Sequence, residues 1–168
     1  MLRLFAMSWG LGGILYGLAS AVLGLWGRAS EALGMELTAV HWAFTIPWVL
    51  FMAYTEGHRG FHRSFSPRVV ARAWVLGRDP RLLHVALAPF FCMGFFHGSR
   101  RRILVSWVLT FFIVVLVLGV RLMSQPWRGL VDLGVVVGLS WGSVSIAWLA
   151  LQSFRAGGTD VDPQLPEG

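Results

Sequence analysis

The sequence predicts an all-α integral membrane protein with four transmembrane helices, a short re-entrant or interfacial hairpin and a cytoplasmic amphipathic helix. Two observations predict this class. Of the 168 residues, 56% are apolar and only 13% are charged, whereas a soluble domain carries about a quarter charged residues. The apolar residues also gather in runs long enough to cross a bilayer. The single cysteine, Cys92, excludes an internal disulfide framework and a cysteine-based zinc site.

Residues 1–154 are predicted to form one multi-pass membrane domain. The four predicted spans cover residues 4–27, 38–55, 103–120 and 130–151. The first run continues past the small residues at 19–21, where a signal peptide would be cleaved, so we interpret it as an uncleaved anchor. The polar segment 155–168 contains proline and glycine and is predicted to be a disordered tail.

The segment between the second and third spans is predicted to stay at one membrane face. A polar stretch begins at Glu56, and Ser66-Pro67 is typical of a helix start. The following residues 67–77 predict an amphipathic helix lying in the membrane interface. Residues 84–97 are apolar but short for a span, with Pro89 near their middle, which is typical of a re-entrant or interfacial hairpin.

The arginine distribution predicts the topology. With the amino terminus inside and 84–97 returning to its own side, three arginines (Arg28, Arg121 and Arg128) face outward. The other eleven face the cytoplasm: Arg3, Arg59, Arg63, Arg68, Arg72, Arg78, Arg81, Arg100, Arg101, Arg102 and Arg155. If 84–97 spans fully, the alternative is five transmembrane helices and a split of nine against five. The positive-inside rule favours the first arrangement, in a bacterial inner membrane with a cytoplasmic amino terminus.

Small residues recur at every fourth position in the first and last spans. They are Gly13, Gly17 and Ala21 in the first span, and Gly134, Gly138 and Gly142 in the last. Small residues at this spacing share one helical face and let helix backbones approach closely in lipid. The simplest interpretation is that these two helices pack on each other within one protomer. A homo-oligomer seam and docking onto a larger membrane complex are the alternatives.

All fourteen basic residues are arginine, and the net charge is +6. Codon usage in a GC-rich genome explains this choice, and so does phosphate recognition, because guanidinium groups bind phosphate in a bidentate manner. The predicted cytoplasmic surface would bind anionic phospholipid headgroups. Its candidate residues are Arg59, Arg63, Arg68, Arg72, Arg100, Arg101 and Arg102. Nucleic acid is a poor partner for so apolar a chain.

Metal chemistry has few candidate ligands. His58 and His62 stand four residues apart, as two ligands on one helix face would. With His84, His97 and Glu56 they would lie at the cytoplasmic side. Histidines that flank apolar segments more commonly bind lipid phosphate or water, so we expect no metal and no cofactor. A metal or haem protein that uses these histidines is an alternative.

The sequence carries no nucleophile elbow, Walker loop or Rossmann glycine pattern. We therefore expect a non-catalytic subunit or scaffold of a membrane complex, with a cytoplasmic face that binds anionic lipid. A membrane enzyme or carrier that acts on a phospholipid or polyprenyl phosphate is the alternative. The sequence names neither a substrate nor a partner.

Overall fold

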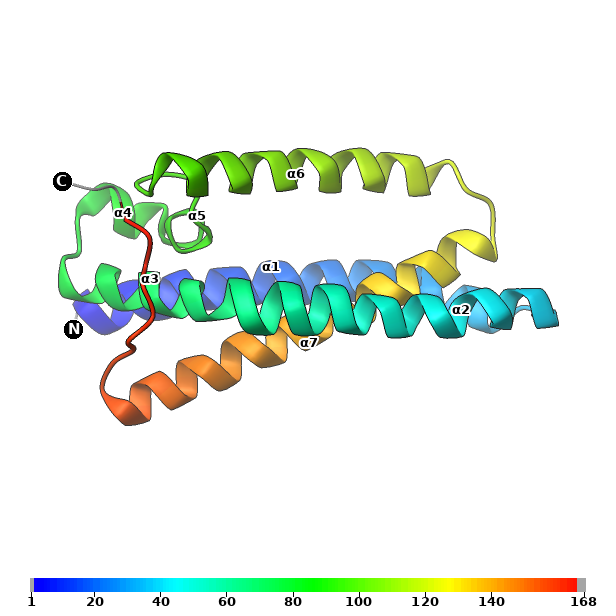
Figure 1. Ribbon diagram of the computed structural model, residues 1–168, viewed down its shortest axis with the longest axis horizontal. Helices are drawn as coiled ribbons and strands as arrows, with labels where there is room; N and C mark the ends of the chain where they lie inside the picture. The colour runs from blue at the N-terminus through cyan, green and yellow to red at the C-terminus, as the bar shows by residue number, and fades with distance from the viewer. Residues whose placement is uncertain (1, 166–168) are drawn as a thin grey trace.

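The structure, a computed structural model, describes residues 2–165 and folds them into helices with short connections. The helices are α1 (Leu2–Leu33), α2 (Ala39–Met52), the π-helix η1 (Ala53–Phe65), α3 (Ser66–Arg78), α4 (Leu82–Ala86), α5 (Ala88–Met93), α6 (Arg100–Arg121) and α7 (Trp127–Ala156). Figure 1 shows the long helices lying roughly side by side, with α4 and α5 gathered at the end where α3 finishes and α6 begins.

The structure confirms the predicted all-α class and contains apolar helices of membrane-spanning length. Within the described residues, three helices are long and apolar enough to cross a bilayer: α1 from Arg3 (31 residues), α6 (22 residues) and α7 (30 residues). At 1.5 Å per residue each exceeds the roughly 30 Å of a hydrocarbon core. The second predicted span coincides with α2, which has only 14 residues before its backbone changes to the π-helical form.

The helices α2, η1 and α3 follow one another without a break, so residues 39–78 form one continuous rod. The sequence suggested a polar connection from Glu56 and a separate helix capped by Ser66. Instead Met52 (φ −65°, ψ −40°) and Ser66 (φ −61°, ψ −43°) keep right-handed helical backbone angles at the two junctions. The π-helical turns end directly before α3, and Pro67 lies in the first turn of α3, where a missing N–H is tolerated best.

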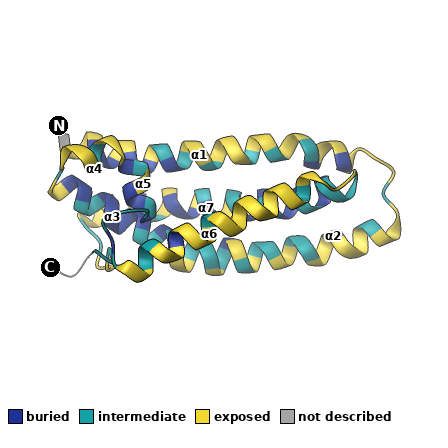
Figure 2. Cartoon of the chain, turned by 90° about the horizontal axis from the view of Figure 1, so that it is seen from above, coloured by how far each residue is buried: buried dark blue, intermediate teal, exposed yellow. Residues whose placement is uncertain are grey.

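The hydrophobic core lies at one end of the bundle, where α1, α3, α5 and α7 meet. Val69, Val70 and Leu76 of α3 pack there with residues of the other three helices, among them Phe91 and Ile146. Figure 2 shows the buried residues concentrated around α3 and α5. Helix α3 is therefore mostly enclosed by its neighbours.

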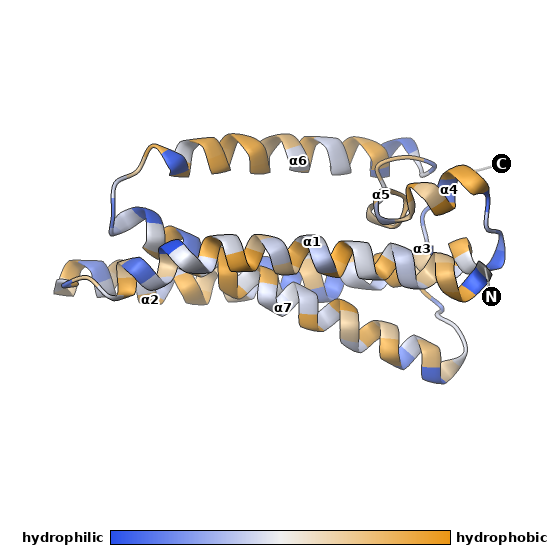
Figure 3. Ribbon diagram, turned by 180° about the vertical axis from the view of Figure 1, so that it is seen from behind, coloured by the Kyte–Doolittle hydropathy of each residue, from blue (hydrophilic) through white to orange (hydrophobic). Residues whose placement is uncertain are grey.

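Helix α6 is attached to the bundle mainly at its first turns. The hydroxyl of Ser106 donates to the Met93 carbonyl (3.3 Å), and the Trp107 indole N–H donates to the Phe95 carbonyl (3.3 Å). Figure 3 shows a largely apolar α6 standing away from α1 and α7 along most of its length. A helix satisfies its own backbone hydrogen bonds, so such an apolar surface is stable in contact with lipid.

The helices α1 and α7 pack on each other within the protomer, as the sequence predicted, but their recurring small residues do not form this contact. On α7, the nearest side chains are Trp48 at Gly134, Glu56 at Gly138 and Phe61 at Gly142, all from α2 and η1. On α1, Gly13 meets Pro89, whereas Gly17 has open space around it and Ala21 is exposed. Each α7 glycine therefore accommodates a larger side chain of the neighbouring rod.

The opposite end of the bundle is closed by an ion pair. Arg28 Nε donates to Asp132 Oδ2 at 2.9 Å, and the aspartate side chain is only 6% exposed. This pair explains an acidic residue at the entrance of α7, because an arginine from α1 balances its charge. It also fixes the end of α1 beside the start of α7.

Candidate anion-binding site

Arg72 organises the end of the bundle that carries the site. Its side chain comes from α3 and is buried, with 1% of its surface exposed. Nε donates to the carbonyl of Phe91 (2.6 Å), and Nη2 donates to the carbonyls of Phe96 (2.9 Å) and His97 (3.0 Å). Nη1 reaches the carboxy-terminal segment and donates to the Pro163 carbonyl (3.0 Å).

This guanidinium group therefore binds backbone carbonyls at all three of its nitrogens. It also lies over the ring of Phe91, with 4.4 Å between Cζ and the ring centroid. Burial lowers the pKa of Arg72, yet arginine keeps its proton in proteins. Arg72 was predicted as a headgroup ligand from its sequence context. The structure places it inside the protein, where it joins α3, the α5–α6 connection and the carboxy-terminal segment.

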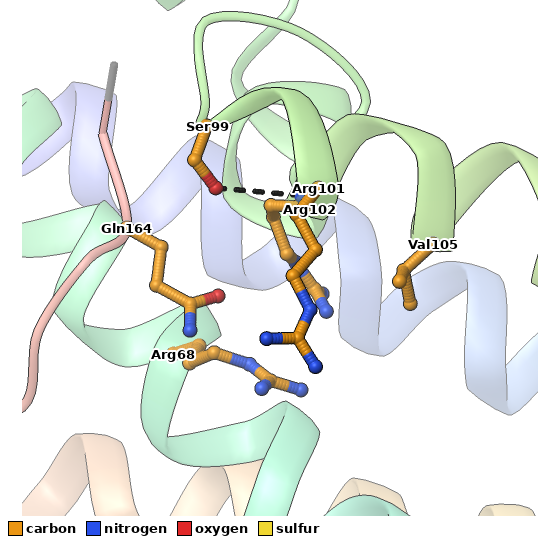
Figure 4. Close-up of a pocket in the computed structure, with 6 residues that line it drawn as sticks. All are labelled: Arg68, Ser99, Arg101, Arg102, Val105 and Gln164. Atoms are coloured by element: carbon orange, nitrogen blue, oxygen red, sulfur yellow. Dashed lines mark hydrogen bonds between the residues drawn. The ribbon is translucent and has the colours of Figure 1, made fainter. Parts of the chain in front are cut away.

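A pocket of about 300 Å³ lies beside Arg72, between α3, the start of α6 and the carboxy-terminal segment. Its lining residues are Arg68, Ser99, Arg101, Arg102, Val105 and Gln164. Figure 4 shows the three arginine side chains extending into the space between the two helices, with Gln164 beside them. Residues 155–165 were expected to belong to a disordered tail. The structure runs α7 on to Ala156 and then brings Gln164 to this pocket.

Local hydrogen bonds hold the pocket walls. Ser99 Oγ accepts from the backbone N–H of Arg102 (3.4 Å) and caps α6, while its backbone N–H donates to the Gln164 carbonyl (3.1 Å). Arg102 Nη2 donates to the Met93 carbonyl (3.3 Å). The α6 side of the pocket and the carboxy-terminal side are thus connected to each other directly.

The described residues that line the pocket carry only positive charges. Three guanidinium groups line it, and no acidic side chain within residues 2–165 does. Arg68 Nε is buried, and among the described residues no hydrogen-bond partner reaches it. Burial also lowers the pKa of Arg68, because its charge has lost part of its contact with water. Such an arrangement is balanced best by a bound anion that accepts several hydrogen bonds.

The remaining predicted headgroup ligands lie outside this pocket. Arg59 and Arg63 are exposed on η1, and Arg100 is exposed at the first position of α6. Of the seven arginines that the sequence suggested, the structure gathers Arg68, Arg101 and Arg102 into one site. Sequence reasoning missed Ser99 and Gln164. A serine directly before a helix is a recognisable cap, but nothing in the sequence brings Gln164 to the start of α6.

The four histidines that the sequence suggested as metal ligands form two separate pairs. The rings of His58 and His62 stack with 5.8 Å between their centroids, and His62 Nδ1 lies 3.3 Å from Ser145 Oγ of α7. A groove of about 250 Å³ borders this pair, between Trp141 and Trp148. The contact links η1 to α7.

The second pair lies beside α5. The rings of His84 and His97 are 4.6 Å apart, and His84 also stacks on Phe91. Burial lowers the pKa of His84, and the positive charges of His97, Arg81 and Arg72 lower it further, while Asp79 opposes the shift. Protonation of His84 therefore brings a positive charge next to other positive charges.

The five suggested metal ligands do not come together. Glu56 lies against Gly138 of α7, apart from the His84–His97 pair. Among residues 2–165, no three side chains of histidine, cysteine, aspartate or glutamate form a group that could hold a metal ion. Two-histidine pairs supply fewer protein ligands than the three or four that zinc sites use.

The pocket that contains Arg68, Arg101 and Arg102 is therefore the site with the clearest chemistry. Comparison with known proteins adds no assignment: no family model, no curated protein and no solved structure matches this chain.

Proposed function

We propose that this protein is a small multi-pass membrane protein that binds the headgroup of an anionic phospholipid and acts as a non-catalytic subunit or scaffold of a membrane complex. The observation that carries the proposal is the convergence of Arg68, Arg101 and Arg102 in one pocket that no acidic side chain of the described residues lines. Guanidinium groups match the geometry of phosphate oxygens and bind them through paired hydrogen bonds. Near an anionic leaflet each arginine adds about 1 kcal/mol of attraction.

The position of the pocket suits a lipid. Val105 of α6 forms one wall, and beyond it Leu104 and Val108 are exposed by 64% and 43%. A headgroup in the pocket would thus continue directly into acyl chains that lie along the apolar surface of α6. A soluble anion would make no use of that surface.

The proposed topology has four crossings, by α1, by α2 with the adjoining turns of η1, by α6 and by α7. Two observations support it. Arg68 precedes residues 82–97 and Arg101 follows them, yet both line one pocket, so α4 and α5 begin and end at the same side. That side also holds the larger share of the arginines, which favours a cytoplasmic location in a bacterial inner membrane, with the amino terminus inside.

The subunit role is supported by α6. Almost all residues of α6 are exposed along the span, and only 6% of the residues in its most apolar stretch are buried. Its surface is therefore free to contact lipid or the helices of another subunit. Purification in mild detergent followed by mass spectrometry of co-purifying proteins and lipids tests this role. A protein recovered alone and monodisperse at every stage would argue against a subunit function.

Lipid binding is tested by thermal unfolding of the full chain in detergent with added phosphatidylglycerol or phosphatidylcholine. We expect phosphatidylglycerol to raise the Tm more. The double substitution Arg68→Gln and Arg101→Gln should remove most of the difference. The substitution Arg121→Gln, at the far end of α6, removes an arginine from the opposite side and should preserve it. Equal Tm shifts in the two lipids for the unmodified protein would refute the proposal.

A further inference from the structure

The pocket offers more hydrogen-bond donors than one singly charged phosphate group needs. Arg68 Nε has no partner among the described residues, and Arg102 uses only Nη2, on the Met93 carbonyl. Arg101 lines the same pocket and is exposed on its outer side. A ligand that balances three cations requires several acceptor oxygens and more than one negative charge.

The carboxy-terminal segment limits the shape of the ligand. Gln164 closes one side of the pocket. Its carbonyl accepts from the backbone N–H of Ser99 (3.1 Å), and the neighbouring Pro163 carbonyl accepts from Arg72 (3.0 Å). A headgroup that extends beyond its phosphate would have to displace this anchored segment, whereas a terminal phosphate would not.

The remaining side of the pocket is apolar. Val105 lines it, one helical turn from Arg101 and Arg102 on α6. A ligand with a terminal phosphate can therefore place that group among the arginines and its hydrocarbon along α6. In this orientation the phosphate is the end of the ligand, and no further polar group extends from it toward the carboxy-terminal segment.

Resting on the proposed function, we propose that the pocket selects a lipid phosphomonoester, such as phosphatidic acid or a polyprenyl phosphate, over phosphodiester lipids. A phosphomonoester carries about −1.5 to −2 charges at pH 7, because its second pKa is about 6, and it presents three terminal oxygens. A phosphodiester such as phosphatidylglycerol carries one charge and a further substituent. Both charge and shape therefore favour the phosphomonoester in this pocket.

The test compares affinities of the full chain in phosphatidylcholine nanodiscs that contain equal mole fractions of phosphatidic acid or phosphatidylglycerol. We expect phosphatidic acid to bind about fivefold more tightly at pH near 7.5, which is the effect of roughly one additional charge contact. At pH near 5 this ratio should fall, because phosphatidic acid then carries about one charge, and the preference that remains measures the contribution of shape. The pH dependence of the ratio separates ligand charge from changes in the protein, since both lipids meet the same protein at each pH.

Matched variants locate the effect. Arg101→Gln should reduce the ratio, whereas Arg100→Gln, which removes an equal charge one residue away and outside the pocket, should leave it near the unmodified value. Equal affinity for both anionic lipids would overturn this inference and leave the proposed function standing. Equal affinity for anionic and zwitterionic lipid would overturn both. If glycerol 3-phosphate or inorganic phosphate raises the Tm as much as phosphatidic acid, the ligand is a soluble phosphate and the lipid selectivity is refuted.

Discussion

Arg72 places a positive charge where the described residues offer it no carboxylate. Backbone carbonyls replace that partner, and they come from α5, the α5–α6 connection and the carboxy-terminal segment. An isolated buried charge is costly, so each of these hydrogen bonds is needed to offset its desolvation. The same bonds hold Phe96, His97 and Pro163 in place around the neighbouring pocket. A buried residue thus shapes a site that it does not line.

Substitution of Arg72 by alanine should lower the free energy of unfolding by about 3 kcal/mol or more, because several buried carbonyls lose their donor. Arg72→Lys should restore only part of this loss, since an ammonium group cannot reach the same carbonyls as the planar fork. Denaturant unfolding in detergent measures the change. Arg63→Ala, an exposed arginine of η1, is the control and should change stability little. A comparable loss in both variants would contradict the role given to Arg72.

The thiol of Cys92 should be unreactive in the folded protein. Its side chain is 1% exposed, and burial raises its pKa to about 12, with only a partial opposing effect from Arg72. The reactive thiolate is therefore scarce at pH 8, and access is blocked. Iodoacetamide should label the denatured chain fully and the native chain very slowly. Rapid native labelling would mean that α5 opens away from α1.

Stability should fall as the pH drops through the range in which histidine titrates. The folded-state pKa of His84 lies below its ordinary value of 6.5, so the unfolded chain binds more protons in that range. By linkage, the free energy of unfolding then decreases as the pH is lowered. Thermal unfolding between pH 8 and pH 5 checks this expectation, and His84→Gln should reduce the slope. A slope that is unchanged in the variant would assign the effect to other groups.

At the scale of helices, apolar runs predicted the positions of the long elements but not their connections. The run of residues 103–120 lies within α6, and 130–151 lies within α7. Hydropathy indicates whether a segment contacts lipid or water, but not which backbone conformation it adopts. The polar residues after Glu56 therefore suggested a loop, whereas in the structure they continue a helix. In the structure Gly57, within this helix, gives space to Trp141, whose ring would lie 2.9 Å from an added Cβ.

The contact between α7 and the neighbouring rod should be sensitive to side-chain volume. A Cβ on Gly142 would lie 2.5 Å from the ring of Phe61, whereas a Cβ on Gly17 of α1 has nothing within 4 Å. Gly142→Leu should therefore cost about 1–3 kcal/mol of stability through overpacking. The matched substitution Gly17→Leu should cost less than 1 kcal/mol. Thermal unfolding in detergent distinguishes them, and equal losses would show that the α7 glycines tolerate larger side chains.

At the scale of the whole molecule, the candidate site was predicted in part. The sequence indicated a basic surface, and the structure selects Arg68, Arg101 and Arg102 from it. Arg68 lies far from Arg101 and Arg102 along the chain, so no local sequence motif indicated the pocket. The role of Arg72 could not be predicted at all, because its partners are backbone carbonyls, which have no residue signature. Packing between distant segments decided which arginines line the pocket.

The orientation of the molecule gives the last prediction. In the proposed topology, Arg81 and Arg101 lie on the cytoplasmic side and Arg121 lies on the outer side. Single cysteines at these three positions, in a Cys92→Ala background, should therefore differ toward a membrane-impermeant maleimide added to intact cells. We expect labelling at 121 and protection at 81 and 101, since the positive-inside rule retains the arginine-rich side in the cytoplasm. Labelling at 81 and 101 with protection at 121 would mean that the protein has the opposite orientation in the membrane. Labelling at 101 but not at 81 would mean that residues 84–97 cross the bilayer. Arg68 and Arg101 would then lie on opposite sides of the membrane, which is incompatible with the pocket that they share.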